Sequence, residues 1–136
     1  KESDRLRKNI ATDASPSLLA SAEAVGRFKL ISKPFEGMTS EDLLPIASRV
    51  AELSPLSVVI LVSITDGSVV VITGLDALKA GLDAGRLTTE FTKALGGRGG
   101  GRNDMGQGRV DPKELGRMAE GLSKVKDLLA GASQKK

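Results

Sequence analysis

The chain of 136 residues contains no cysteine, histidine, tryptophan or tyrosine, and only three phenylalanines. Without cysteine it has no disulfide framework and no thiolate metal ligand. Because histidine is also missing, it has no Ser/His/Asp triad, no Cys/His pair and no imidazole base near neutral pH. Zinc sites are excluded on the same grounds, and the carboxylates are scattered. The sequence therefore predicts no catalytic residue, no metal and no cofactor in this chain.

Two further absences concern partners and setting. The scarcity of aromatic side chains disfavours the stacking platforms that usually hold single-stranded nucleic acid. No apolar run approaches the roughly 18 residues of a membrane-spanning helix, and no signal-peptide pattern opens the chain. We therefore expect a cytoplasmic protein without a membrane partner. Because the first residue is Lys1 and not methionine, we also expect a fragment whose parent continues on the N-terminal side.

The strongest structural signal is a pair of β-branched runs, Val58–Val62 and Val69–Ile72, on either side of Asp66-Gly67. This pattern predicts a β-hairpin of strands that are buried on both faces. A further strand is expected over Arg27–Phe35. Helical patterns surround these strands, at Pro16–Val25, at Leu43–Leu53, at Asp83 or Ala84 to Leu95, and from Pro112 onward. A capping box at Thr39–Asp42 precedes the second of these helices, but Pro45 conflicts with it because it removes an amide donor one turn into the helix.

These elements predict an α/β fold, in which a β-sheet with a central hairpin is covered by helices and preceded by an N-terminal helical arm. We expect residues 1–14 to be the end of that arm or a linker. Residues 15–130 form the globular domain, and residues 131–136 form a flexible tail.

The positive charge is concentrated in the last third of the chain. Residues 1–95 carry 11 Lys and Arg against 12 Asp and Glu, a net charge of −1, whereas residues 96–136 carry 9 against 5, a net charge of +4. This basic part begins with a glycine-rich loop, Gly96–Arg109, in which seven of fourteen residues are glycine and three are arginine. Glycines allow successive backbone amides to converge on an anion, and arginines add forked donors for phosphate.

Anion binding competes with other interpretations of this loop. A phosphate-binding P-loop needs Lys-Ser/Thr after a strand, and this loop has neither the Lys-Ser/Thr nor the strand. The dinucleotide-binding pattern Gly-x-Gly-x2-Gly fits the loop in no register. A disordered Arg/Gly segment is disfavoured because the run is short and lies between two helical patterns. From composition alone, a flexible linker and an anion-binding nest remain equally good interpretations.

The stretch from Leu95 through the triplet Gly99–Gly101 and Arg102 to Gln107 resembles the glycine-rich signature of the C-terminal domain of alanyl-tRNA synthetases. That domain belongs to the family associated with DHH phosphoesterases, whose members typically place histidine after the glycine triplet. Arg102 at that position favours the synthetase branch. The order of strands and helices extends the resemblance to about residues 15–130.

The resemblance implies a non-catalytic domain of a parent alanine–tRNA ligase. This domain is expected to bind the outer corner of tRNA, to aid aminoacylation and editing, and to support dimerisation. Alanine-specific tRNA is implied by the resemblance only. The residues expected to bind RNA lie in the loop and just after it: Gly97, Arg98, Gly99, Gly100, Gly101, Arg102, Asn103, Gln107, Arg109, Lys113 and Arg117.

A homodimer is expected from the same resemblance. The apolar stripe after the loop has three- and four-residue steps that suit either a dimer seam or packing on the chain's own sheet. Its members are Leu115, Met118, Leu122, Val125 and Leu129. Two alternative functions remain: the substrate-binding domain of a DHH-type phosphoesterase or free-standing tRNA-editing protein, and a structural dimerisation module whose loop is only a linker.

Overall fold

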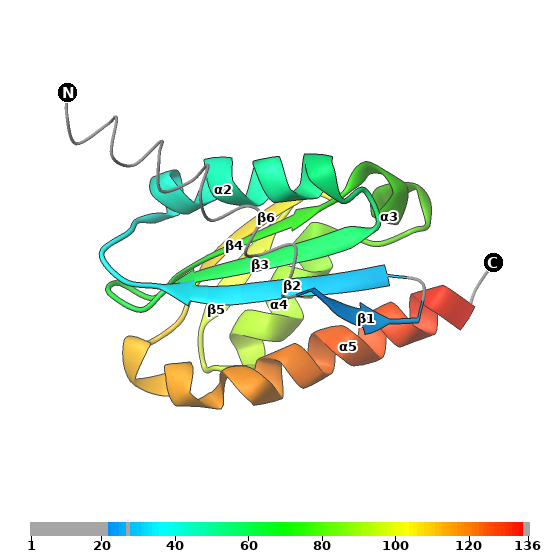
Figure 1. Cartoon of the computed structure of the whole chain (residues 1–136). Coiled ribbons are helices and arrows are strands. Elements are labelled where there is room, and N and C mark those ends of the chain that lie inside the picture. Colours follow the sequence, from blue (N-terminus) through cyan, green and yellow to red (C-terminus); the bar gives the residue numbers. More distant parts are fainter. Residues whose placement is uncertain (1–21, 27, 135–136) are drawn as a thin grey trace, which may run out of the picture.

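The computed structural model describes residues 22–26 and 28–134, which form one six-stranded sheet with helices on both faces (Figure 1). The strand order is β1-β2-β3-β4-β6-β5. The strands are β1 Glu23–Val25, β2 Phe28–Phe35, β3 Ser57–Ser63, β4 Ser68–Thr73, β5 Arg98–Gly101 and β6 Met105–Arg109. The helices are α2 Ser40–Leu53, α3 Leu75–Lys79, α4 Ala84–Ala94, the 3-10 helix η1 Pro112–Arg117 and α5 Met118–Gln134. The predicted α/β fold is confirmed, while the predicted arm and linker lie outside the described residues.

The central β3–β4 hairpin has the buried strands that the sequence predicted. Every residue of both strands is buried, and the antiparallel register pairs Val58 with Thr73 and Val62 with Val69. Gly67 has a φ of 79°, a conformation that few side chains tolerate and that suits a tight turn. Since neither face of this hairpin is exposed to solvent, its strands need no alternation of apolar and polar residues.

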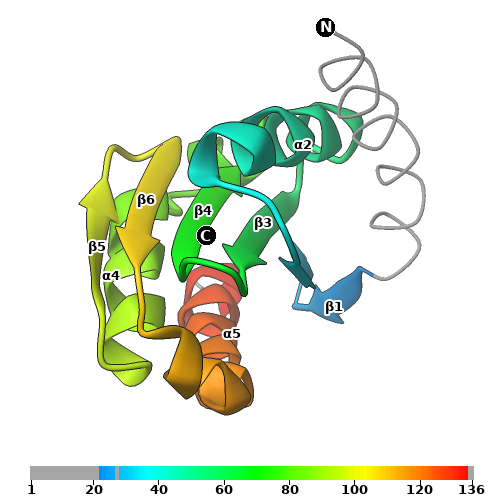
Figure 2. The ribbon, with the colours of Figure 1, turned by 90° about the vertical axis from the view of Figure 1, so that its left-hand side faces the viewer.

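Two apolar cores cover the two faces of the sheet. On one face α2 packs on β3 and β4, with Leu43, Ile46 and Val50 fully buried or nearly so. On the other face α4 and α5 pack together, and Phe91 and Leu129 are among their largest wholly buried side chains. Figure 2 shows α2 on one side of the sheet and α4 and α5 on the other.

The predicted helix over Pro16–Val25 is wrong where the structure describes it. Residues Glu23–Val25 form β1, which pairs antiparallel with β2 so that Val25 is the partner of Phe28. Gly26, which directly follows the predicted helix, has a φ of 62° and begins the turn after β1. A glycine with this conformation suits a helix end and a hairpin equally, and pairing with β2 decides between them.

Strand β2 continues through Pro34, a residue type that a paired strand usually excludes. The Lys29 amide donates to the Leu56 carbonyl on the β3 side. Because successive backbone amides along a strand point to alternate sides, the nitrogen of Pro34 lies on the side of β2 away from β3. Strand β1 reaches only as far as Leu30 along that side. Pro34 therefore lies on an open edge, where no ladder hydrogen bond is lost.

Helix α2 begins at the predicted capping box despite Pro45. The Asp42 carboxylate accepts hydrogen bonds from the backbone amide and the hydroxyl of Thr39, at 3.1 and 3.3 Å. Pro45 lies within the helix and is exposed. The buried face supplied by Leu43, Ile46 and Val50 thus outweighs the missing amide donor.

The C-terminal helix corrects two expectations. It continues to Gln134, so the predicted flexible tail beyond residue 130 is helical as far as it is described. Val125 and Leu129 are fully buried in the chain's own core. These two side chains are therefore not available for a dimer seam, whereas Met118 and Leu122 are only partly buried. The side chain of Leu115 lies outside the described part.

Candidate nucleic-acid interface

The glycine-rich segment is a β-hairpin and not the loop that its composition suggested. Strands β5 and β6 pair antiparallel, with Arg98 opposite Arg109 and Gly100 opposite Gln107, and β6 pairs with β4. The backbone groups of β6 are thus engaged in ladders on both sides, and those of the edge strand β5 on the side that faces β6. Within the segment only Gly96 and Gly101 have positive φ angles. The convergent amides of an anion-binding nest are therefore absent from this described segment, and so is the flexible linker.

The glycines are needed because α4 packs directly on the hairpin. A Cβ atom on Gly99 would lie 2.7 Å from the Thr88 Cγ2 atom, and one on Gly108 would lie 2.8 Å from the Thr92 Cγ2 atom. A Cβ on Gly106 would overlap the Thr88 hydroxyl. Both threonines are fully buried, and their hydroxyls donate to backbone carbonyls of α4. The bare strands therefore let the helix approach the sheet more closely than side chains would permit.

The tip of the hairpin is fixed to the first turn of α4. The Ala84 and Gly85 amides donate to the carbonyls of Asn103 and Arg102, each at 2.8 Å. The carboxylate of Asp83 accepts from the Arg86 amide and completes the cap. These hydrogen bonds use amides that a helix start would otherwise present to an anion. The side chains of the tip, by contrast, are exposed.

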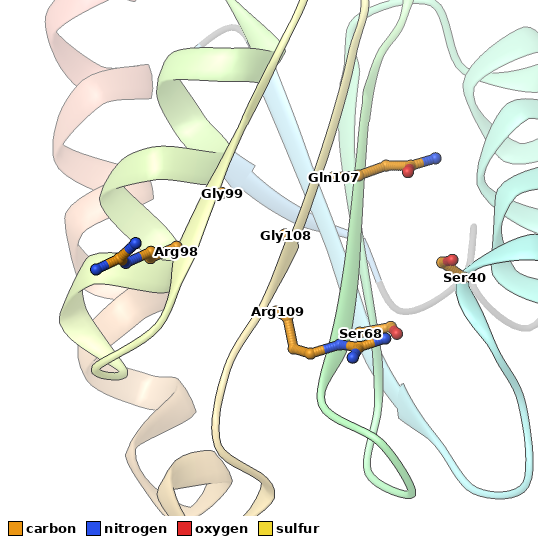
Figure 3. Close-up of a pocket in the computed structure, with 7 residues that line it drawn as sticks. All are labelled: Ser40, Ser68, Arg98, Gly99, Gln107, Gly108 and Arg109. Atoms are coloured by element: carbon orange, nitrogen blue, oxygen red, sulfur yellow. The ribbon is translucent and has the colours of Figure 1, made fainter.

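The face of β5–β6 that points away from α4 is open and forms one side of a groove of about 520 Å³. Gln107 and Arg109 extend from β6 into or across it, while Ser40 at the start of α2 lies opposite (Figure 3). The residues that line this groove are Ser40, Ser68, Arg98, Gly99, Gln107, Gly108 and Arg109. We call it the arginine groove, because arginines are its only charged lining residues among those described.

The two arginines of the groove are cross-strand neighbours whose side chains diverge. Arg109 extends over Ser68, and Arg98 points away from β6 (Figure 3). Both are exposed, so both guanidinium groups are accessible from solvent. Divergent forks beside a strand without side chains suit two separate phosphates better than one anion held between them.

A carboxylate lies close to Arg109 at the edge of the groove. The pKa of the Asp66 carboxyl is lowered chiefly by the hydrogen bond that it accepts from the Ser68 backbone amide, at 2.9 Å. The hydroxyls of Ser68 and Ser63 and the charge of Arg109 lower this pKa further, and burial opposes them. Ser68 is the cross-strand partner of Arg109, which places the carboxylate beside the base of the arginine side chain.

The structure divides the predicted RNA-binding residues into four groups. Arg98, Gln107 and Arg109 belong to the arginine groove with Gly99, whereas Arg102 and Asn103 are exposed at the hairpin tip. Four residue steps along the strand separate Arg98 from Arg102, a distance of about 13 Å.

The third group follows β6. Lys113 is exposed, and Arg117 forms ion pairs with Glu120 at 2.9 Å and Glu114 at 3.3 Å, which raise the pKa of its guanidinium. The charge of Arg117 is thus already balanced by two carboxylates.

The remaining predicted residues, Gly97, Gly100 and Gly101, are backbone of the hairpin and offer no side chain. Gly97 packs against Val110, and Gly100 has open space beside it. Sequence reasoning missed Ser40 and Ser68, which come from α2 and β4. No local pattern marks a serine that becomes a groove wall only when distant elements meet.

Two kinds of feature are absent from the described residues. They contain no group of three acidic, histidine or cysteine side chains that would hold a metal ion. No helix among them has the length and apolarity to cross a bilayer.

A model of the DHHA1 domain matches residues 27–131, which include the whole hairpin and all but the last turn of α5. The chain belongs to the DHHA1 domain family. Its relatives include the alanine–tRNA ligase of Methanococcoides burtonii, 34% identical over 131 residues, which are 95% of this chain and 14% of that protein. The alanine–tRNA ligase of Solibacter usitatus is 32% identical over 117 residues, 85% of this chain and 13% of that protein. This DHHA1 domain therefore spans about one seventh of these relatives' length.

Solved structures show the same fold. The C-Ala domain of Aquifex aeolicus alanyl-tRNA synthetase superposes with a TM-score of 0.73 at 27% identity, covering 82% of this chain and 99% of that domain. RecJ of Thermus thermophilus in complex with Mn²⁺ gives a TM-score of 0.70 at 19% identity, covering 93% of this chain and 17% of RecJ. The likeness to RecJ is one of fold alone. The resemblance drawn from the glycine-rich signature is thus confirmed.

Proposed function

We propose that this DHHA1 domain is the C-terminal domain of a cytoplasmic alanine–tRNA ligase. It performs no chemistry and binds the outer corner of tRNA, which aids aminoacylation and the editing of mischarged tRNA. The observation that carries the proposal is the arginine groove, where exposed Arg98 and Arg109 lie on the glycine-rich strands β5 and β6 beside Gln107. The relatives named alanine–tRNA ligase, which match most of the chain, support the same assignment.

The groove suits a folded RNA for three reasons. The backbone of Gly99 and Gly108 lines the groove, and the neighbouring Gly100 has no side chain in the open space beside it, so a sugar-phosphate backbone can approach the main chain closely. Arg98 and Arg109 donate to phosphate oxygens, and the Gln107 amide can donate to or accept from a sugar or a base edge. Since the chain has no tryptophan or tyrosine on which bases could stack, binding depends on shape and phosphate contacts, as in the recognition of structured RNA.

The test is a salt titration of tRNA binding to the purified domain. We expect affinity to fall as salt rises, because phosphate contacts release counterions. The variant Arg98→Ala/Arg109→Ala should bind about tenfold more weakly or worse, with a salt slope lower by about 1 to 2. Lys79→Ala/Lys124→Ala, which removes two exposed cations of α3 and α5 outside the groove, is the matched control. Unchanged affinity in the double variant would remove the groove from the proposal.

A comparison of ligands tests the part of the tRNA that is bound. An intact tRNA presents its corner, whereas an acceptor-stem hairpin does not. We expect the domain to bind the intact tRNA more tightly by about tenfold, since each added good contact contributes about 1 kcal/mol. Equal affinity for the two RNAs would contradict recognition of the outer corner.

We also propose that the domain forms homodimers through the exposed parts of Met118 and Leu122 and the neighbouring surface of α5. Both side chains pack against the core and are only partly buried, whereas Val125 and Leu129 are fully buried. Sedimentation should show a dimer at tens of micromolar, and Leu122→Lys should return it to a monomer. A monomeric wild-type domain at that concentration contradicts this part of the proposal.

A second candidate function is the substrate-binding domain of a DHH-type phosphoesterase, because the family model that matches the chain is that of the DHHA1 domain and not of a synthetase-specific domain. The two functions differ in ligand. A phosphoesterase domain should bind short oligonucleotides as tightly as tRNA, whereas the synthetase domain should prefer tRNA.

A further inference from the structure

The arginine groove has a counterpart at the other end of the same seam. Helix α2 runs parallel to β4 and opposite in direction to β6, so its start faces Arg109 and its last turns face Met105. A second hollow of about 470 Å³ lies there. Its lining residues are Ser48, Ala51, Glu52, Pro55, Ile72, Thr73, Gly74, Leu75, Asp104 and Met105. We call it the acidic hollow, and Met105 and Arg109 are separated by about 13 Å along β6.

The two hollows have opposite charge. The arginine groove is lined by two arginines and no acid, and the acidic hollow by Glu52 and Asp104 and no base, as far as the described residues go. Glu52 forms a long ion pair of 4.0 Å with Arg49, in which both side chains are more than 60% exposed, so its charge remains largely uncompensated. The Asp104 side chain is exposed at the hairpin tip.

The wall of the acidic hollow is also unsuited to phosphate. It has apolar surface, and Leu75 is 61% exposed. The Thr73 amide, an obvious donor there, is already bonded to the Asp104 carbonyl at 3.3 Å. Phosphate oxygens that left water for this surface would lose hydrogen bonds and face two carboxylates. The apolar lining residues are Ala51, Pro55, Ile72, Leu75 and Met105.

We infer that Glu52 and Asp104 are specificity-determining residues that restrict RNA to the arginine end of the seam. This inference rests on the proposed function and adds to it the direction of the RNA. A strand laid along β6 would pass from Arg109 to the carboxylates over about 13 Å, so its next phosphates would lie beside them, within the screening length of about 8 Å at physiological salt. The RNA backbone therefore crosses the β5–β6 hairpin instead of following β6.

A consequence is discrimination between RNA shapes. A compact corner presents a few phosphates to one site and then turns away, so it avoids the acidic hollow. An extended single strand, which would gain contacts by following the seam, meets repulsion there. The two carboxylates thus disfavour unstructured RNA without any contact to tRNA.

The experiment compares an unstructured 12-mer of uridine with folded tRNA, on the wild-type domain and on Glu52→Gln/Asp104→Asn. We expect the variant to bind the 12-mer about three- to tenfold more tightly, with a salt slope steeper by about 1, because one or two more phosphates are engaged. Affinity for tRNA should change by less than about twofold. The control is Glu90→Gln/Asp127→Asn, which removes the same charge from α4 and α5 on the other face of the sheet.

The outcomes separate the inference from the proposed function. If both double variants gain equally for both RNAs, net charge alone is responsible and the inference is wrong. If neither variant gains, the acidic hollow does not limit the RNA, and the inference is again wrong although tRNA still binds. If the wild-type domain and the Glu52→Gln/Asp104→Asn variant both fail to bind either RNA, the proposed function falls and the inference with it.

Discussion

Gly106 lies against Thr88 so closely that the strand and the helix leave no space for one additional carbon. Thr88 is fully buried, and its hydroxyl donates to the Ala84 carbonyl at 2.7 Å, so a move of this side chain would break that hydrogen bond. On the neighbouring strand, a methyl group added to Gly100 would meet only the Thr89 hydroxyl, at 3.9 Å. The hairpin therefore contains glycines of two kinds, those required by packing and those that are not.

This difference predicts a contrast between two substitutions. Gly106→Ala should lower the free energy of unfolding by about 1–3 kcal/mol, the usual cost of an additional carbon in a packed core. Gly100→Ala should change it by less than about 1 kcal/mol, since the methyl group meets ordinary contacts. Urea unfolding followed by circular dichroism measures both. Equal losses would show that the packing against Thr88 is not the cause.

A second prediction uses a compensating pair. Gly99→Ala should be destabilising because its Cβ meets the Thr88 methyl carbon at 2.7 Å. Thr88→Ser removes that methyl group but keeps the hydroxyl that bonds to Ala84, so it should restore part of the lost stability. We expect a coupling free energy of about 1 kcal/mol in the double-mutant cycle, within the range for residues in contact. Additive effects would contradict the assigned contact.

The lowered pKa of Asp66 makes a prediction about acid stability. Because the pKa of this carboxyl in the folded state lies below its ordinary value of 3.8, the carboxylate stabilises the fold above that value, and the contribution is lost as the pH falls through the folded-state pKa. The wild-type protein should therefore have a higher free energy of unfolding than Asp66→Asn at pH 6, and this difference should shrink as the pH falls below about 3.8. Thermal melts across this range give the difference. A difference that persists at about pH 2.5, well below the ordinary carboxyl pKa, would mean that the carboxylate charge is not responsible.

The two ends of the apolar stripe on α5 should respond differently to truncation. Leu129→Ala should cost about 2–5 kcal/mol of stability whatever the protein concentration, since Leu129 is fully buried within one chain. Leu122 is only partly buried, so Leu122→Ala should cost less stability and should weaken self-association. Unfolding curves at two protein concentrations, with sedimentation, separate the effects.

The elements with strong local patterns were predictable from the sequence. The β3–β4 hairpin follows from its β-branched runs, and α4 follows from Leu87, Phe91 and Leu95 at four-residue spacing. Capping residues placed the starts of α2 and α4. In each case local preference and tertiary packing favour the same structure.

The elements without such patterns were not predictable. Strand β1 has a helical apolar pattern and becomes a strand only because β2 offers it an edge. The β5–β6 hairpin is nearly bare of side chains, so no periodicity reveals it, and its strands depend on Thr88 and Thr92 of another element. The arginine groove combines α2, β4 and the hairpin, and Ser40 and Ser68 enter it through the topology alone.

The attachment of the hairpin tip to α4 also has a consequence for hydrogen exchange. The Ala84 and Gly85 amides are protected by carbonyls of Asn103 and Arg102, not by their own helix. Their exchange with deuterium therefore requires the hairpin to detach from α4, whereas amides further along the helix exchange when the helix itself opens. Two backbone amides thus act as natural reporters of hairpin detachment, separate from global unfolding and without an introduced label.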